Sequence, residues 1–182
     1  MTKGFYIEHP INIIGAGRDQ TFVKGYGGFV IRGKKKKGKN VVLKDMTISE
    51  ASTSGVYGEN GLSWLCDSMT ITQCRGSGVH AENTKGRLIN CIITQCRRSG
   101  IYCDSSALIE LEGDQTKVDG NGTDEYDYGL DTYDTSSTIH LLYPLTKESV
   151  STNNQGGGNY NDRDTISTVA SFNNSTTSTT TN

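Results

Sequence analysis

Apolar and polar residues alternate along most of the chain in short runs, separated by glycine, asparagine and serine. Two such runs are MTITQC at 69–74 and GVHAE at 78–82. Alternation with a period of two is typical of strands that are buried on one face, and the intervening residues favour turns. No segment shows convincing helical periodicity. The pattern therefore predicts an all-β chain built from short strands and polar turns.

The chain contains a repeat of 22 to 23 residues. The sequence ITQCRGSGVHAE at 71–82 returns as ITQCRRSGIYCD at 93–104, which is 22 residues later. A third copy, MTISEASTSGVYGE at 46–59, aligns with 69–82 at a spacing of 23. A weaker match joins 105–121 to 136–154, where an insertion at 121–134 widens the spacing. Self-similarity at a fixed period indicates a repeat architecture.

One repeat of this length cannot bury its apolar face alone, but copies stacked in parallel can. Strands then lie about 4.8 Å apart, and equivalent residues form ladders along the stack. The expected inward ladders are Ile48–Ile71–Ile93, Met46–Met69–Cys91, Ala51–Cys74–Cys96 and Val56–Val79–Ile101. We therefore expect a right-handed parallel β-helix of six or seven rungs over residues 1–164, starting at Phe5–Ile7. The Ser/Thr/Asn-rich segment 165–182 is expected to be disordered in its last ten or so residues.

Repeats of the form MTITQCRGSGVHAEN resemble the parallel β-helix repeats of the pectin-lyase-like superfamily. The opening HPINIIGAGRDQTFVKGYGGFVIRG is similar to the early rungs of such proteins. The chain also resembles uncharacterised β-helix proteins of marine microalgae. The resemblance covers roughly residues 4–170 and implies the fold, but the superfamily includes lyases, hydrolases, epimerases, phage spikes and adhesins. No lyase, epimerase or polygalacturonase motif is legible, and Arg75 and Arg97 align in the turn before the ladder strand.

Two outward columns follow from the inward position of Val56, Val79 and Ile101, because neighbouring residues of a strand face opposite sides. The segment GLDTY at 129–133 aligns with GIYCD at 100–104 and extends both columns. One column reads Tyr57, His80, Tyr102 and Asp131, and the other reads Glu59, Glu82, Asp104 and Tyr133.

Stacked carboxylates repel one another unless they share a proton, bind a cation or are screened by solvent. Together, the aromatic and acidic columns favour a polysaccharide site, in which aromatic faces pack on sugar rings. Its expected catalytic residues are His80, Glu82 and Asp104, with His80 the best proton-transfer candidate. Its expected binding residues are Tyr57, Glu59, Tyr102, Asp131 and Tyr133, and a possible Ca2+ site consists of Glu82, Asp104 and Asp131. An ordinary solvent-exposed β face is the alternative.

Two charged segments interrupt the repeats. The insertion NGTDEYDYGLDTYD at 121–134 carries five acids and enters the ladder face, where it would form a lip. It is either a second Ca2+ candidate or, because it lacks EF-hand spacing, a solvated acidic loop. The basic run RGKKKKGKN at 32–40 is expected to be a solvated turn. Binding of sulfated glycan or nucleic acid, or an import signal, is its alternative.

Composition limits the partners. The net charge is −2 and the pI about 5.9, so no dedicated nucleic-acid partner is expected. No run of 18 apolar residues is present, so no membrane span is expected. No signal peptide is visible, which predicts a cytoplasmic protein unless a longer, secreted precursor exists. Five cysteines without metal-ligand spacing are expected to be buried free thiols.

The sequence predicts three competing functions. The favoured one is a non-catalytic scaffold for carbohydrate binding or cell-surface interaction, which presents the two columns. A polysaccharide lyase or glycoside hydrolase acting on acidic polysaccharide is the first alternative, and a purely structural β-helix is the second. Open ends of the β-helix would also favour self-association.

Overall fold

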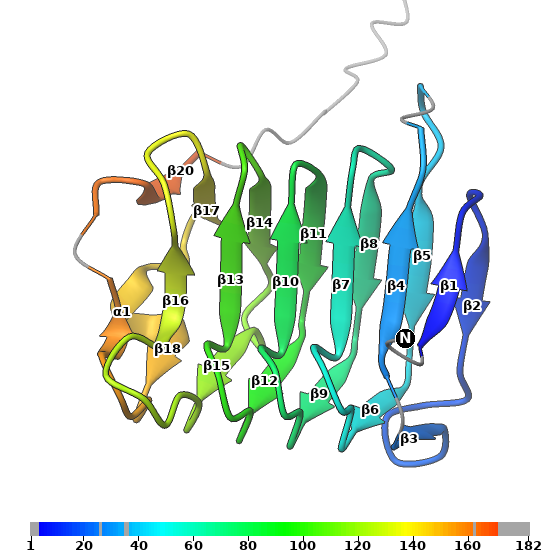
Figure 1. Cartoon of the computed structure of the whole chain (residues 1–182), viewed down its shortest axis with the longest axis horizontal. Helices are drawn as coiled ribbons and strands as arrows, with labels where there is room; N and C mark the ends of the chain where they lie inside the picture. Colours follow the sequence, from blue (N-terminus) through cyan, green and yellow to red (C-terminus); the bar gives the residue numbers. More distant parts are fainter. Residues whose placement is uncertain (1–3, 26, 35–36, 162, 171–182) are drawn as a thin grey trace, which may run out of the picture.

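The chain folds as a right-handed parallel β-helix of about seven turns, as the repeat predicted (Figure 1). The computed structural model describes residues 4–25, 27–34, 37–161 and 163–170. Each full turn contributes one strand to each of three parallel sheets, so that strands more than 20 residues apart in sequence lie side by side. The expected order of rungs and the all-β class are therefore confirmed.

Within the described ranges, the three sheets have seven, seven and six strands. The ladder sheet consists of β1 (Phe5–Ile7), β4 (Phe29–Arg32), β7 (Val56–Glu59), β10 (Val79–Glu82), β13 (Ile101–Asp104), β16 (Tyr128–Thr132) and β19 (Gly158–Tyr160). The second sheet consists of β2 (Asn12–Ile14), β5 (Val41–Lys44), β8 (Trp64–Asp67), β11 (Lys85–Ile89), β14 (Leu108–Glu112), β17 (Thr138–Leu142) and β20 (Ile166–Val169). The third sheet consists of β3 (Phe22–Lys24), β6 (Thr47–Ser49), β9 (Thr70–Thr72), β12 (Ile92–Thr94), β15 (Lys117–Asp119) and β18 (Ser151–Thr152).

One short helix, α1 (Lys147–Val150), precedes β18. The side chain of Thr146 accepts a hydrogen bond from the backbone N–H of Ser149 and caps the helix N-terminus. The sequence pattern did not predict this helix, because four residues are too few to show a helical period.

The predicted inward ladders are confirmed. Ile71 pairs with Ile48 on one side and with Ile93 on the other. In the ladder sheet, Val79 pairs in the same way with Val56 and Ile101. The aligned residues Met46, Met69 and Cys91 are also buried, as are Ala51, Cys74 and Cys96. The interior of the coil is therefore a set of stacked apolar columns.

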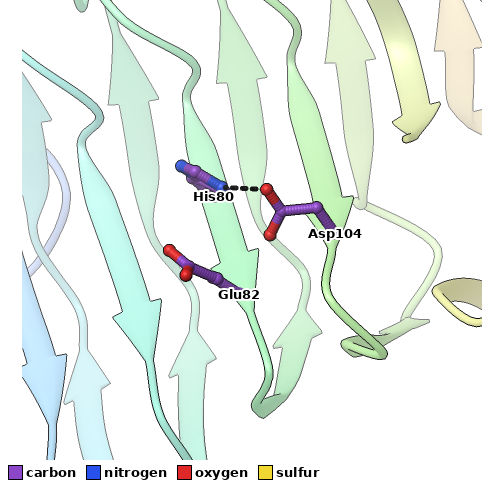
Figure 2. A group of neighbouring side chains, drawn as sticks. All are labelled: His80, Glu82 and Asp104. Atoms are coloured by element: carbon purple, nitrogen blue, oxygen red, sulfur yellow. Dashed lines mark ion pairs between the residues drawn. The ribbon is translucent and has the colours of Figure 1, made fainter. Parts of the chain in front are cut away.

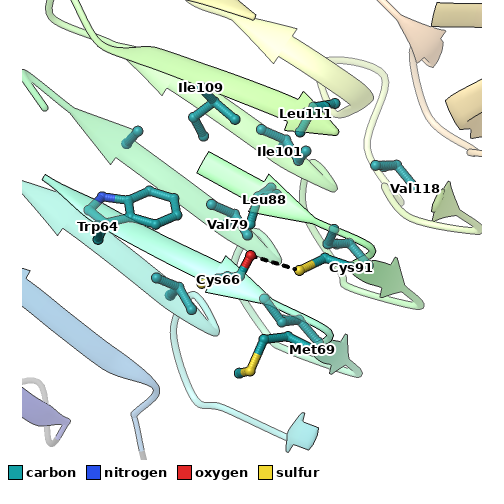
Figure 3. Packing of buried hydrophobic residues seen from close by; sticks show 14 of the residues in the cluster. Trp64, Cys66, Met69, Val79, Leu88, Cys91, Ile101, Ile109, Leu111 and Val118 are labelled. Carbon is teal, nitrogen blue, oxygen red and sulfur yellow. Dashed lines mark hydrogen bonds between the residues drawn. The ribbon is translucent and has the colours of Figure 1, made fainter. Parts of the chain in front are cut away.

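Trp64 is buried in the core and packs against glycines of its own rung and of the next rung (Figure 3). A Cβ atom at Gly58 would lie 2.1 Å from Trp64 Nε1, and one at Gly86 would lie 2.2 Å from Trp64 Cζ2. Gly86 is the ladder partner of Trp64, so the indole ring occupies the space that a side chain would otherwise fill. Trp64 therefore requires glycine at position 86 of the next rung.

All five cysteines are free and buried, as expected. Cys91 Sγ donates a hydrogen bond of 3.4 Å to the carbonyl oxygen of Cys66 (Figure 3). Burial raises the pKa of the Cys66 and Cys103 thiols, which keeps them protonated and unreactive. These thiols act as small apolar side chains of the core.

The predicted ends and surface segments are only partly covered by the described residues. Residues 171–182, which include the segment expected to be disordered, lie outside them, and so do Lys35 and Lys36 of the basic run. The rest of that run joins β4 to β5. In the described ranges, no helix is long and apolar enough to cross a membrane.

We predict that Ile71→Asp unfolds the stack, because it places an unpaired charge in a buried ladder with a paired strand on each side. The expected loss is about 4 kcal/mol or more of unfolding free energy. Urea unfolding followed by circular dichroism measures it. Thr72→Asp is the matched control, since Thr72 follows Ile71 on β9 but faces outward, and it should change stability by less than about 1 kcal/mol. A stably folded Ile71→Asp protein would show that this register is wrong.

Candidate functional site

Three aromatic side chains lie in a row across β7, β10 and β13 on the outer face of the ladder sheet. His80 pairs with Tyr57 on one side and Tyr102 on the other. The His80 ring stacks on Tyr57 with centroids 4.7 Å apart and meets Tyr102 edge-on at 4.9 Å. The structure thus brings together these three residues in the register that the repeat predicted.

A column of carboxylates runs beside this aromatic column. Glu82 pairs with Glu59 and Asp104 in neighbouring strands. The Tyr57 hydroxyl donates a hydrogen bond to Glu82 Oε2. His80 Nε2 lies 3.5 Å from Asp104 Oδ2, and Figure 2 shows the imidazole and this carboxylate turned toward one another, with Glu82 next to them. Side chains of the aromatic column therefore contact the carboxylates that would otherwise face only like charges.

Burial shifts the pKa values of His80, Asp104 and Tyr102. Burial lowers the pKa of His80, against the opposite influence of Asp104 and Glu82, and it raises the pKa of Asp104. Burial also raises the pKa of Tyr102 to about 12. His80 Nε2 and Asp104 Oδ1 are buried and form no hydrogen bond with any described residue. The pair is therefore poorly solvated and incompletely satisfied, which is common at functional sites.

Asp131 lies beside Tyr102, as the alignment predicted, but it is buried rather than exposed. Ser99 Oγ donates to Asp131 Oδ2 at 3.2 Å, and Asn161 Nδ2 donates to Oδ1 at 2.6 Å. Burial raises the pKa of Asp131 although both hydrogen bonds favour its ionised form. Both carboxylate oxygens are thus already engaged within the protein.

A pocket with a volume of about 1180 Å³ opens over the ladder sheet. Of the eight residues predicted for the site, the pocket is lined by His80, Tyr102, Asp104, Asp131 and Tyr133, but not by Tyr57, Glu59 or Glu82. The inserted segment contributes Asp124, Tyr126 and Asp127 to its wall. The insertion therefore borders the columns and gives the face depth.

Several polar residues of the pocket were missed in the sequence. Arg98 lines it, although the repeat aligns Arg75 with Arg97. Arg98 directly follows Arg97, so the doubled arginine was the available signal. Asn161 and Arg163 also line the pocket, but they follow β19, where no repeat copy marks them.

One group of side chains among the described residues could hold a metal ion. His80, Glu82 and Asp104 each offer a ligand atom, and these atoms all lie within 4.8 Å of one another. Asp131, the third residue of the expected Ca2+ site, lies outside this group. The cluster therefore combines one imidazole with two carboxylates.

The family comparison agrees with the geometry of the coil. A family model described as "Right handed beta helix region" matches residues 11–143, and the chain belongs to this family. Searches of curated proteins and of solved structures found no match. The family accounts for the scaffold, whereas the side chains of the pocket must carry any argument about a ligand.

Two aspartates of this region should influence stability with opposite pH dependence. The folded pKa of Asp131 is raised, so its contribution to stability is fully present below pH 3.8 and is lost as the pH rises through the folded pKa. Asp134 has a pKa lowered to about 2, chiefly by the hydrogen bond from Ser136, so its contribution is present above pH 3.8 and is lost as the pH falls toward 2.

The check is urea unfolding of the wild type, Asp131→Asn and Asp134→Asn between pH 2 and pH 7. The stability of the wild type relative to Asp131→Asn should decrease as the pH rises. Relative to Asp134→Asn it should increase. Parallel curves for the two variants would contradict the opposite roles assigned to these carboxyls.

Proposed function

We propose that the protein is a non-catalytic scaffold that binds an acidic polysaccharide in the pocket over the ladder sheet. The observation that carries the proposal is the pair Arg75 and Arg98, which are exposed and line the pocket. Neither forms an ion pair with a residue that the structure describes. Arginine is well suited to binding carboxylate or sulfate groups through paired hydrogen bonds.

The other lining residues suit a sugar chain. Tyr126 and Tyr133 are large exposed aromatic residues beside Tyr102, and aromatic rings supply apolar faces for the C–H surfaces of sugars. Serine and threonine hydroxyls of the same wall can donate or accept hydrogen bonds with sugar hydroxyl groups, and aspartate carboxylates can accept them. An open pocket that is lined mainly by polar residues and carries aromatic platforms favours an extended sugar polymer over a small apolar ligand.

The combined change Arg75→Ala and Arg98→Ala should weaken binding of uronate oligosaccharides at least tenfold, because each lost charge-assisted bond contributes about 1.5–3 kcal/mol. Isothermal titration calorimetry with uronate oligomers and with their methyl-esterified forms measures this loss. Arg97→Ala is the matched control, since Arg97 is an exposed neighbour that does not line the pocket. Equal affinity for the ionised and esterified oligomers would contradict an acidic ligand.

An enzymatic role on acidic polysaccharide is the second candidate. Oxygens of Glu82 and Asp104 lie within 4.8 Å, close to the separation of about 5–5.5 Å between the carboxyl groups of retaining glycosidases. The raised pKa of Asp104 suits a general acid. Release of reducing ends or unsaturated uronates, abolished by Glu82→Gln, would establish this role in place of simple binding. Neither binding nor turnover would leave a purely structural β-helix.

We also propose that the first turn associates with a second copy of the chain. Its strands β1, β2 and β3 are the terminal strands of their sheets, so each pairs on one side only among the described residues. This turn carries five of the exposed large apolar side chains, which are Phe5, Tyr6, Ile11, Ile14 and Phe22. Exposed strand edges with apolar side chains favour pairing with another chain, and two identical ends can pair with each other around a two-fold axis.

Phe5→Glu combined with Phe22→Glu should convert a dimer into a monomer, because like charges then meet across the shared end. Sedimentation velocity at several protein concentrations measures the change. Tyr143→Glu is the control, since Tyr143 is an equally exposed aromatic residue distant in sequence, following β17. A wild-type protein that stays monomeric at high micromolar concentration would rule out this interface.

A further inference from the structure

The cluster of His80, Glu82 and Asp104 has donors of two kinds on two adjacent strands. His80 and Glu82 are two residues apart on β10, so they face the same side of the sheet, and Asp104 is the partner of Glu82 on β13. Figure 2 shows His80 and Asp104 turned toward one another, with the Glu82 side chain next to them on the same face. Because each residue lies on a paired strand, the backbone fixes the positions from which the three side chains extend.

The separations suit a small divalent cation. Bonds of about 2.0–2.2 Å in tetrahedral coordination place ligand atoms roughly 3.4 Å apart. His80 Nε2 and Asp104 Oδ2 are 3.5 Å apart, which already matches such an edge. The remaining separations are at most 4.8 Å, and a small rotation of the longer Glu82 side chain would close them.

Two atoms of the cluster lack a hydrogen-bonding partner. His80 Nε2 and Asp104 Oδ1 are inaccessible to solvent and form no hydrogen bond with a described residue. Leaving such groups unsatisfied is unfavourable, and a cation bound between them would satisfy both. This observation is separate from the spacing of the cluster, and it points to the same position.

The donor set distinguishes among cations. Imidazole nitrogen suits Zn2+ and other late first-row metals, whereas Ca2+ and Mg2+ prefer sites made only of oxygen ligands. The hydrogen bond from Tyr57 orients Glu82, as outer partners of metal-binding carboxylates do. Arg98 opposes cation binding here, because its positive charge reaches His80 and lowers the pKa of that side chain. The two carboxylates outweigh that single charge.

We propose that His80, Glu82 and Asp104 form a three-ligand site for Zn2+ or a similar late first-row metal ion. His80 and Asp104 also line the large pocket, so the fourth coordination position of the ion faces a space that solvent and ligands can enter. Three protein ligands with one open position are characteristic of zinc sites that bind exchangeable ligands. The site depends on the cluster alone and stands independently of polysaccharide binding.

The experiment titrates the full, metal-free chain with Zn2+ and, separately, with Co2+ and Ca2+, without any polysaccharide. Calorimetry gives the affinity, and the visible absorption of Co2+ reports ligand number and type. Zn2+ should bind with one-to-one stoichiometry and more tightly than Ca2+. His80→Gln, Glu82→Gln and Asp104→Asn should each weaken Zn2+ binding by about 100-fold or more, since the loss of outer partners alone costs 10–100-fold.

His140→Gln is the matched control. His140 is a half-buried residue of β17 that faces Glu110 of the neighbouring strand, but it lies outside the described group that could bind a metal. The buried cysteines are closed to the ion in the folded chain, and circular dichroism of each variant verifies that the fold is kept. Equal Zn2+ affinity in His80→Gln and His140→Gln would overturn the proposal, and so would tighter binding of Ca2+ than of Zn2+.

Discussion

Each turn of this coil needs the turns before and after it to bury its apolar side chains. The in-register pairing of parallel strands is therefore the constraint on which the structure depends. Pairing places Ile71 between Ile48 and Ile93, and the same register sets the neighbours of all the other residues in the rung. A single-residue slip would turn each inward side chain outward and would expose the whole ladder. This constraint is visible in the sequence as the spacing of 22 to 23 residues between copies.

The same register controls the surface. A residue type that is repeated in successive rungs stands next to its own kind at the strand spacing, which is harmless for isoleucine but unfavourable for carboxylate. The chain reduces this problem by placing tyrosine and histidine next to the acids. Tyr57 donates a hydrogen bond to Glu82, and His80 approaches Asp104. Unlike side chains in adjacent rungs thus create a chemically mixed cluster from a repeated pattern.

The fold and the register of the columns could be predicted because they are encoded locally in each copy. Comparison of residues 71–82 with 93–104 is enough to align Val79 with Ile101 and His80 with Tyr102. The burial of Asp131 could not be predicted, because Asn161 covers it from 30 residues further along the chain and no repeat copy contains that asparagine. The role of Arg98 was missed for a related reason. The repeat aligns Arg97, not Arg98, with Arg75. Only the path of the turn decides which of the two neighbouring arginines faces the pocket.

The pocket lies where the periodicity fails. Regular rungs produce a continuous outer face without walls, and a ligand on such a face would contact little more than one row of side chains. The residues between β15 and β16 break the spacing, and Asp124, Tyr126 and Asp127 from this segment form a wall beside Tyr102. The adjacent rung also departs from the pattern inside the coil. There Asn121 occupies the position equivalent to Cys96 of the previous rung, and its side-chain oxygen accepts a hydrogen bond from the backbone N–H of Cys96. Regular stacking thus supplies the rigid floor, and the interruption supplies the shape and the polar groups that a binding site requires.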